Sequence, residues 1–488
     1  MTPHIINPNE IKLGSIMKTL KYFVKEKLSI FIIGIILILA YSLIFPFITS
    51  NLCVGLYDEN EGLALDETVV STYFSRYLEE KGWQQGIWHT FTVLSNEPST
   101  EVIINFHISG NSWYNKYQCN ARFKFWNVEH PDVKTEISAI NIPYHAPEKK
   151  AHRFIYCNRL EDLLPNTLYA MQISYFDISL NSVQKSQIKR FRTFPDNPEQ
   201  ETDFNVIFGG SISNSDLVTE MHKIAAKTNP YAVFLGGDIV YDSGFQEWYW
   251  MWDRFFDTWE KYMIRPIDQA MIPISSVIGE NDLGQNAYMS RAETKIEKLN
   301  YVTFLHSHEH GQDSIFRDRI RFRGYNASVY SLSLGFEGHY QQKDTLRWLD
   351  ETLNLHQDEF KIAYYHYPLF PACGDHQFFK VELETRTNAT DIFKRYNLKL
   401  AFEHNEQLYK VSYPMSQLQK AENSENSTVY LGGGFWSALN ATWSFEETQA
   451  PEYIEKRDII NHVWIFDVYR KQAKSLSING DIIDTIKF

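Results

Sequence analysis

The stretch Val206-Ile-Phe-Gly-Gly-Ser-Ile-Ser213 runs from an apolar segment into glycines and serines. A second apolar segment leads into Gly236-Gly-Asp-Ile-Val-Tyr-Asp242, where the glycines are followed by two aspartates. Apolar runs of this length predict buried strands, and the loops that leave such strands are where α/β domains place functional side chains. One Gly-Asp pair at a strand end is weak evidence. Several polar blocks in a fixed order are more specific, and together they predict one site built from several strand ends.

After Phe204 the chain alternates between short apolar segments and amphipathic segments, which is typical of a layered α/β domain. We expect strands at Val206–Gly209, Ala232–Gly237, Pro273–Gly279 and Lys361–His366, and helices at Asp216–Thr228, Gln246–Tyr262, Arg291–Leu299 and Thr345–Leu353. In the second helix Trp248, Trp252, Phe255 and Trp259 recur at helical spacing. This spacing predicts a stripe that faces the core rather than an aromatic binding surface.

Residues 90–198 differ from this, because short alternating segments such as Val102–Ile108 and Tyr169–Tyr175 are separated by turn residues. The alternation predicts an all-β sandwich. Leu160–Tyr169 resembles the corner and strand entry of fibronectin type III-like domains. A polar linker follows, and the layered domain is expected to span residues 203–488. The predicted fold class is therefore α+β and multidomain.

An apolar run without charges covers residues 28–49, close to the ~20 residues that span a bilayer. We expect an uncleaved membrane helix, because the apolar part of the alternative, a cleaved signal peptide, is only about 7–15 residues long. Lysines precede the run and acidic residues follow it. The positive-inside rule then predicts a single-pass type II protein, with residues 1–27 in the cytosol and the bulk outside the cell or in a lumen. Residues 50–89 are expected to form a stalk.

Composition restricts the partners and the compartment. The formal net charge of -13, without a basic stripe, argues against nucleic acid, so the expected partners are the membrane and other proteins of a membrane assembly. Candidate glycosylation sites on the exported side are Asn326, Asn388, Asn426 and Asn440. Cys119 and Cys157 are the candidate pair for one disulfide in an oxidising lumen.

Five blocks supply polar side chains at predicted strand ends. They are Gly209–Ser213, Gly237–Tyr241, Gly279–Asp282, Tyr364–Pro368 and Phe402–Lys410. A phosphoester hydrolase with two metals needs a bridging carboxylate, terminal ligands such as histidine and asparagine, and an acid that protonates the leaving oxygen. The order and loop positions of the blocks resemble the calcineurin-like metallophosphoesterases, and specifically the purple acid phosphatases with their fibronectin-like N-terminal domain.

The resemblance covers about residues 90–488 and includes Ser477–Ile486, which looks like the closing hairpin of that family. It implies that Asp238 is the metal-bridging aspartate, Tyr241 the iron-binding tyrosine and His366 a histidine ligand of the second metal. Gly432–Gly434 is expected to allow close backbone approach beneath the site.

Other positions depart from the family pattern. Ser211 stands at the first-block aspartate, Glu280 at the metal-binding asparagine, and Asn281 at the histidine thought to protonate the leaving group. Asn405 and Gln407 stand at the two histidines of the last block. This alignment leaves His404 one position out of register.

These departures predict no metal or one weakly bound divalent metal, and no dinuclear iron-type centre. Of the iron-type site only Asp238 and Tyr241 remain, and a hydroxyl plus an amide do not replace a carboxylate and an imidazole. Asp238, Glu280, His366 and the Asn405 carbonyl are an oxygen-rich set that suits Mg²⁺, Ca²⁺ or Mn²⁺ weakly.

Without a second metal and a proton donor, the chain is expected to be inactive or impaired as an enzyme and to use its fold for binding or assembly. The alternative is an active single-metal hydrolase of phosphomonoesters, because Asp238, Tyr241 and His366 survive together. Asp375-His376 is the candidate for a substitute acid.

The remaining histidine cluster is expected to have no role in the site. His306, His308 and His310 alternate with other residues and would converge on a metal only in an extended segment. A solvated loop is the favoured interpretation. We therefore leave the three histidines out of the predicted site.

Overall fold

The computed structural model describes most of the chain beyond residue 85. It covers residues 86–109, 121–142, 144, 153–177, 182–212, 217–284, 299–305, 316–334, 342–372, 381, 383–433, 436 and 449–488. The predicted cytosolic tail, the predicted membrane span 28–49 and most of the predicted stalk lie outside the described residues. Within the described ranges, no helix is both long and apolar enough to cross a bilayer.

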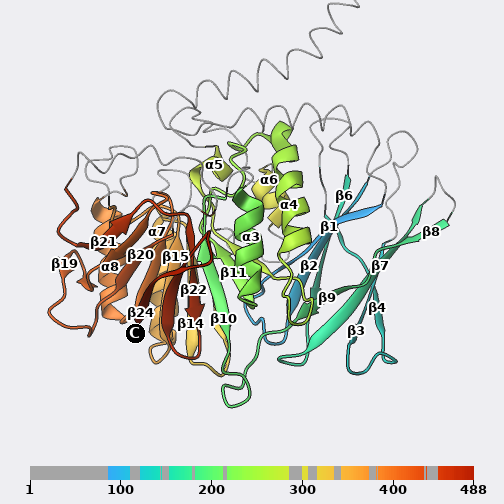
Figure 1. Cartoon of the computed structure of the whole chain (residues 1–488), viewed down its shortest axis with the longest axis horizontal. Coiled ribbons are helices and arrows are strands. Elements are labelled where there is room, and N and C mark those ends of the chain that lie inside the picture. Colours follow the sequence, from blue (N-terminus) through green and yellow to red (C-terminus); the bar gives the residue numbers. More distant parts are fainter. Residues whose placement is uncertain are drawn as a thin grey trace, which may run out of the picture. The chain divides into compact units, whose positions relative to one another are not determined.

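A ten-stranded sheet carries the first three site loops (Figure 1). Its centre holds the parallel strands β10 (Asn205–Gly209), β11 (Ala232–Leu235) and β12 (Ile274–Ser276). The sheet continues on one side into β22 (His462–Asp467), β23 (Gln472–Ser477) and β24 (Ile482–Lys487), and on the other into β1 (Ile87–Val93), β2 (Val102–Ser109), β6 (Arg153–Leu160) and β5 (Asn141–Ile142). The central strands are short apolar runs and largely buried, as expected for parallel strands that are covered on both faces.

A seven-stranded sheet carries the other two site loops. In spatial order its strands are β13 (Arg317–Phe322), β14 (Ala327–Leu332), β15 (Phe360–Tyr365), β16 (Leu400–Glu403), β20 (Val429–Gly432), β17 (Tyr409–Ser412) and β21 (Ile454–Asp458). A small hairpin of β18 (Met415–Ser416) and β19 (Gln419–Lys420) follows β17. Phe208 of β10 stacks on Phe402 of β16 with ring centroids 3.9 Å apart, so the two sheets face each other across one aromatic core.

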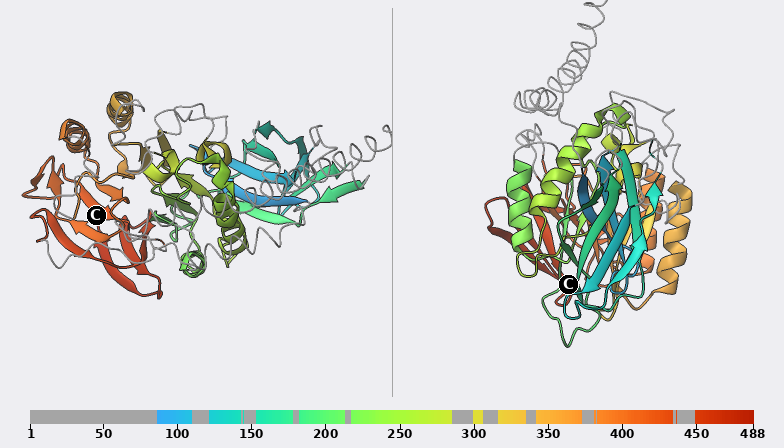
Figure 2. Two further views of the ribbon diagram at one scale, coloured as in Figure 1. Left: turned by 90° about the horizontal axis from the view of Figure 1, so that it is seen from above. Right: turned by 90° about the vertical axis from the view of Figure 1, so that its right-hand side faces the viewer.

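Helices cover the outer faces of both sheets, as the right-hand view of Figure 2 shows. The 3-10 helix η2 (Gln246–Trp248) precedes α4 (Tyr249–Tyr262), and the remaining helices are α3 (Leu217–Lys227), α5 (Glu280–Leu283), α6 (Asn300–Leu305), α7 (Gln342–Leu355) and α8 (Leu383–Arg395). α3 and α4 pack on the ten-stranded sheet, and α7 and α8 on the seven-stranded one. Trp252, Phe255 and Trp259 are buried, which confirms the predicted core-facing stripe. The layers are thus helix, sheet, sheet and helix.

Residues 86–192 form strands and no helix wherever the structure describes them, which confirms the all-β prediction for this segment. A five-stranded sheet contains β4 (Thr135–Ser138), β3 (Arg122–Asn127), β7 (Leu168–Asp177), β8 (Ser182–Lys185) and β9 (Lys189–Arg192). Its apolar side chains share a core with those of β2 and β6, so this segment is a sandwich. Its fibronectin type III-like topology stays a prediction.

The sandwich continues into the layered domain without a break in the sheet. Val93 of β1 pairs in parallel with Ile274 of β12, and the backbone N–H of Leu94 donates to the Ile274 carbonyl at 2.9 Å. One sheet therefore crosses the boundary that the sequence placed near residues 198–203. Residues 87–89, which were expected to lie in the stalk, instead belong to β1, and His89 is buried there.

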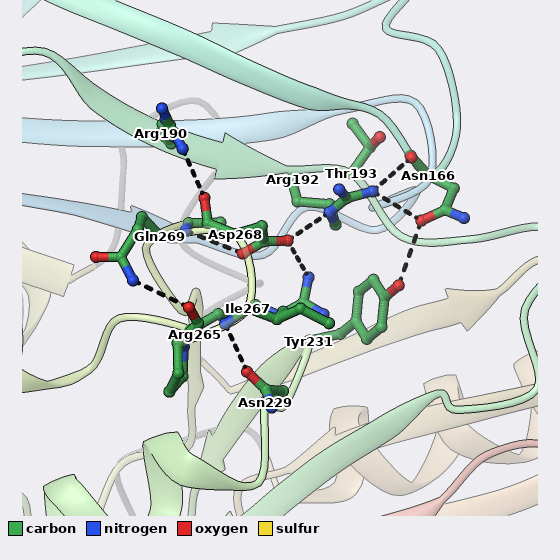
Figure 3. A network of polar contacts seen from close by, with 12 residues as sticks. Asn166, Arg190, Arg192, Thr193, Asn229, Tyr231, Arg265, Ile267, Asp268 and Gln269 are labelled. Atoms are coloured by element: carbon green, nitrogen blue, oxygen red, sulfur yellow. Dashed lines mark hydrogen bonds and ion pairs between the residues drawn. The ribbon is translucent and has the colours of Figure 1, made fainter. Parts of the chain in front are cut away.

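A polar network around Asp268 joins the sandwich to the loops that precede β11 and β12 (Figure 3). The Asp268 carboxylate accepts hydrogen bonds from Arg192 Nε at 2.7 Å and from Arg265 Nη1 at 3.0 Å. Arg192 Nη1 also donates to the carbonyl of Asn166 at 2.7 Å, and the Tyr231 hydroxyl donates to Asn166 Oδ1 at 3.2 Å. Strand β9 is thereby fixed to the layered domain at the edge opposite the site loops.

His222 of α3 is expected to make the fold sensitive to acid. Its ring is buried and lies 5.3 Å from that of Trp259 and 5.6 Å from that of Trp436, and burial lowers the pKa of His222 to about 3. The unfolded chain takes up this proton near the ordinary pKa of 6.5, whereas the folded chain does not. Stability therefore falls as the pH drops below that value, by about 2 kcal/mol at about pH 5 for this residue alone.

His222→Phe is expected to flatten this pH dependence, measured by denaturant unfolding at neutral pH and at about pH 5. Phenylalanine keeps the aromatic contacts and cannot be protonated. Exposed His130 serves as the control, because His130→Phe removes a histidine from the surface. An unchanged acid dependence in His222→Phe would show that this ring is not responsible.

Candidate functional site

The first two site loops leave their strands through residues with a left-handed backbone. Gly237, Asp238 and Tyr241 have φ angles of +88°, +53° and +61°, and Ser211 has +51°. For the non-glycine residues such a conformation costs about 1–3 kcal/mol each, so the surrounding fold must hold it in place. A Cβ at position 237 would lie 2.7 Å from Nδ1 of His366, which explains the glycine there.

Three of the predicted ligands meet at these strand ends. Asp238 follows β11, Glu280 begins α5 after β12, and His366 follows β15, so both sheets contribute. One ligand atom from each residue lies within 4.8 Å of the other two. Asp238 and His366 are buried, and Glu280 is partly exposed. Two carboxylates and an imidazole suit one divalent ion by charge and ligand type.

The ring of His366 is oriented by Gly236, whose carbonyl oxygen accepts a hydrogen bond from Nδ1 at 2.7 Å. Nε2 therefore faces the site, 3.5 Å from Oδ1 of Asp238 and 3.0 Å from Nδ2 of Asn405. Burial alone would lower the pKa of His366, but the charges of Asp238 and Glu280 raise it to about 9, which favours the imidazolium.

The contact with Asn405 favours the neutral ring instead, because an amide N–H needs a lone pair on Nε2. The hydrogen bonds of Asn405 indicate which of the two states, neutral or protonated His366, fits this arrangement. Nδ2 of Asn405 also lies 3.1 Å from Oε2 of Glu280, and a carboxylate can only accept. The atom between the two side chains is therefore the amide nitrogen, and we assign His366 as neutral in this arrangement.

Asn281 covers the carboxylate of Asp238 with two donors. Its backbone N–H donates to Oδ1 at 2.9 Å, and its side-chain Nδ2 donates to Oδ2 at 2.7 Å. An amide does not release a proton at physiological pH. Asn281 thus lies beside the retained aspartate, as its position in the third block predicts, without the chemistry of a general acid.

Asp282 holds these loops together, although the sequence assigned it no role. Its carboxylate accepts the backbone N–H groups of Gly279 and Asp238 at 2.8 Å each, and that of Ile239 at 3.1 Å. Burial and the charge of Asp238 raise the pKa of Asp282 to about 7. Its position could have indicated this role, because Asp282 stands three residues after Gly279, the N-cap of α5. An acidic side chain at that position commonly bonds back to the backbone of the N-cap residue.

The two amide side chains of the last block, Asn405 and Gln407, lie beside residues that were predicted as metal ligands. Nδ2 of Asn405 faces Glu280 and His366, and Nε2 of Gln407 donates to the hydroxyl of Tyr241 at 2.7 Å. Oδ1 of Asn405 has no hydrogen-bond partner within the described part of the chain. Both amides therefore point their nitrogens at side chains that the family resemblance identifies as metal ligands or their substitutes.

His404 lies outside the cluster of three ligands. Its Nδ1 donates to the carbonyl of Tyr365 at 3.0 Å, and burial lowers the pKa of His404 to about 3, so the ring is neutral. A Cβ at Gly433 would lie 2.2 Å from the ring, which confirms the expected close approach at this glycine. Ser211 is also buried, and its Oγ has no hydrogen-bond partner among the described residues.

A dinuclear iron-type centre does not fit these residues. At the positions predicted for the iron ligands, Ser211 and Gln407 offer a neutral hydroxyl and an amide in place of a carboxylate and an imidazole. The Tyr241 hydroxyl is already engaged by an amide N–H from Gln407. One divalent ion among Asp238, Glu280 and His366 is compatible with the ligand types.

Lys410, Glu403 and Glu406 form a buried charged cluster beneath the last site loop, and the sequence predicted no role for it. Nζ of Lys410 lies 2.9 Å from Oε2 of Glu403 and also contacts the Glu406 carboxylate. The two carboxylates accept backbone N–H groups of Leu369 and Ala372, each at 2.7 Å. The cluster thereby joins the loop after β16 to the loop after β15.

Some predicted residues lie outside the described part of the chain. They are His306, His308, His310, Asp375, His376, Cys119 and Asn440. Cys157 is buried in β6, and its disulfide with Cys119 stays a prediction. Asn326, Asn388 and Asn426 are exposed, as glycosylation requires.

Comparisons with known proteins agree with this architecture. Residues 208–402 match the family model described as calcineurin-like phosphoesterase, and no curated protein matches the chain. Purple acid phosphatase PPD1 from yellow lupin (Lupinus luteus) seeds is similar with a TM-score of 0.63 and 13% identity, over 82% of this chain and 74% of that one. PhoD is similar with a TM-score of 0.56 and 10% identity, over 83% of this chain and 90% of that one. At such identities the likeness shows the fold alone.

Proposed function

The chain has a metallophosphoesterase-family fold, and we propose that it is a membrane-anchored binding or assembly component with little or no phosphoesterase activity. The observation that supports this proposal is the donor set of the site. Amide side chains of Asn281, Asn405 and Gln407 stand where a dinuclear phosphoesterase needs imidazoles. A fold can be kept for binding after its chemistry is lost.

The expected loss of rate is large. A positioned general acid contributes about 100- to 10,000-fold, and the amide of Asn281 supplies no such proton. A second metal stabilises the attacking and leaving oxygens in two-metal sites, and at two positions predicted for its ligands Ser211 and Gln407 offer a hydroxyl and an amide. The two losses together place phosphomonoester hydrolysis far below that of an intact site.

Turnover of p-nitrophenyl phosphate by the full-length protein, purified in detergent, tests this proposal. The assay is run with Mg²⁺, Mn²⁺, Zn²⁺ or iron, at mildly acidic and at neutral pH. We expect the wild-type rate to equal that of Asp238→Ala prepared in the same way, because both then report only contaminating phosphatases. A metal-dependent rate that is present in the wild type and absent in Asp238→Ala would overturn the proposal.

The second candidate function is a single-metal hydrolase of phosphomonoesters, and the convergence of Asp238, Glu280 and His366 favours it. These residues would hold the ion, which would polarise a phosphoryl oxygen when bound. Tyr367 shares a hydrogen bond with Glu280, and burial together with that carboxylate raises the pKa of Tyr367 well above its usual value. A phenol that stays protonated is a poor acid, so this candidate predicts slow turnover even when the ion is present.

We also propose the membrane anchor and the lumenal or extracellular placement of the bulk, on the apolar run at residues 28–49 and the lysines before it. Asn326, Asn388 and Asn426 are exposed and accessible to glycan addition in that compartment. Treating the protein from its native membranes with a glycosidase that removes N-glycans is expected to increase its gel mobility. Replacement of each sequon asparagine by glutamine should remove the shift stepwise. Complete resistance of the wild type would contradict export.

A further inference from the structure

We propose that the amide N–H groups of Asn281 and Asn405 take the place of bound cations, so that the acidic site is held in its native form by hydrogen bonds and needs no metal. The inference rests on the proposed loss of the dinuclear centre. It further states that amide N–H groups satisfy the remaining acceptors, Asp238, Glu280 and His366. An inactive protein that still depends on a metal ion would contradict this inference and leave the proposed function intact.

The carboxylate of Asp238 is the first acceptor. It is buried, and a buried carboxylate without compensating donors costs several kcal/mol of folding free energy. Asn281 supplies one donor to each oxygen, at 2.9 Å from the backbone and 2.7 Å from the side chain. The aspartate is therefore satisfied on both oxygens by one residue.

Glu280 and His366 are the second pair of acceptors, and Asn405 serves both. Its Nδ2 lies 3.1 Å from Oε2 of Glu280 and 3.0 Å from Nε2 of His366. A divalent ion that bound these two side chains would need distances of about 2.0–2.6 Å to each of them. The amide nitrogen thus occupies the space between the two ligands where an ion would have to bind.

Binding of an ion requires Asn405 to rotate its amide and to present Oδ1 in place of Nδ2. This exchange breaks two hydrogen bonds and forms one weak metal ligand. Gln407 repeats the arrangement at the neighbouring position, because its Nε2 donates to the Tyr241 hydroxyl at 2.7 Å. At both positions where the family pattern has a histidine, this chain therefore has an amide that donates an N–H group. Asn405 donates to Glu280 and His366, and Gln407 donates to Tyr241.

Asn405→Asp tests the inference, because it replaces the N–H donor by a carboxylate oxygen of nearly the same shape. The thermal midpoint of the full-length protein in detergent is measured with EDTA and with Mn²⁺, Ca²⁺ or Mg²⁺. We expect the wild-type midpoint to be the same in all conditions. In Asn405→Asp it should fall by several degrees with EDTA, because a third carboxylate then lies beside Glu280 and the amide donor that Asn405 supplied is lost, and it should recover when an ion is added.

Asn354→Asp is the matched control, since exposed Asn354 uses its Oδ1 to accept a bond from Gln357 and a carboxylate keeps that role. Its midpoint should not respond to metal. If Asn405→Asp does not fold, Asn281→Asp replaces it, because it places the same charge next to Asp238. The wild-type midpoint with EDTA and with metal tests the inference without any variant. A wild-type midpoint that falls with EDTA or rises with an ion overturns the inference, as does an Asn405→Asp variant that behaves like the wild type.

Discussion

Replacing Lys410 with methionine is expected to lower the free energy of unfolding by about 3–5 kcal/mol, because loss of one partner leaves buried charges uncompensated. Lys410 is 1% exposed and lies against Glu403 and Glu406, which are also buried. Burial alone would lower the pKa of Lys410, but the two carboxylates raise it above its usual value, so the side chain is an ammonium. Methionine keeps most of the volume and removes the charge. Guanidinium unfolding followed by tryptophan fluorescence measures the change.

Lys394→Met is the control for the same substitution on the exposed surface of α8, and it should change stability by less than about 0.5 kcal/mol. Adding Glu403→Gln and Glu406→Gln to Lys410→Met should restore part of the loss, because both unpaired charges are then removed. If Lys410→Met and Lys394→Met proved equally stable, the buried cluster of Lys410, Glu403 and Glu406 would not contribute to the free energy of unfolding.

Replacing Arg153 with methionine is expected to cost about 3–5 kcal/mol for the same physical reason. Arg153 is 3% exposed on β6 and donates to both oxygens of Asp253 on α4, with Nη2 3.0 Å from Oδ2. Its guanidinium also lies over the ring of Trp88 at 4.6 Å from the centroid, a contact that adds further attraction. Burial alone would raise the pKa of Asp253, but Arg153 keeps it below the usual value, so the pair is charged.

Arg347→Met provides the comparison, because Arg347 pairs with Asp344 on the exposed surface of α7, where such pairs contribute about 0–1 kcal/mol. Asp253→Asn in the Arg153→Met background should recover stability, since the carboxylate that has lost its arginine and keeps only the contact with His89 is then replaced by a neutral amide. A loss in Arg153→Met no larger than in Arg347→Met would mean that β6 and α4 are held together by apolar contacts alone.

Much of the site could be predicted from sequence because its residues follow parallel strands. The ends of neighbouring parallel strands meet at one edge of a sheet, so polar blocks after several such strands must come together. The structure accordingly brings Asp238, Glu280 and His366 within 4.8 Å of one another. In the last block, Asn405 contacts Glu280 and Gln407 contacts Tyr241, while His404 bonds to the carbonyl of Tyr365; the family register of this block stays a prediction.

The residues that support the site could not be predicted in the same way. Asp282 binds backbone groups of the loop that carries Asp238, more than 40 residues away in sequence, and backbone donors leave no trace in side-chain patterns. Glu403, Glu406 and Lys410 are of residue types that are rarely buried unless they are paired, and no pairing was predicted for them from the sequence. Their burial depends on the loop after β15 covering them, which no local signal encodes.

The amino-acid sequence by itself determined the order of the strand-end blocks, and with it the metallophosphoesterase-family fold. These are local properties, because each block combines a short apolar run with a turn. Only the tertiary structure decided that one sheet joins the sandwich to the layered domain and that Asn281 and Asn405 aim N–H groups at the carboxylates of Asp238 and Glu280. The direction of an amide depends on which acceptors surround it, and those acceptors come from residues more than 40 positions apart in the chain.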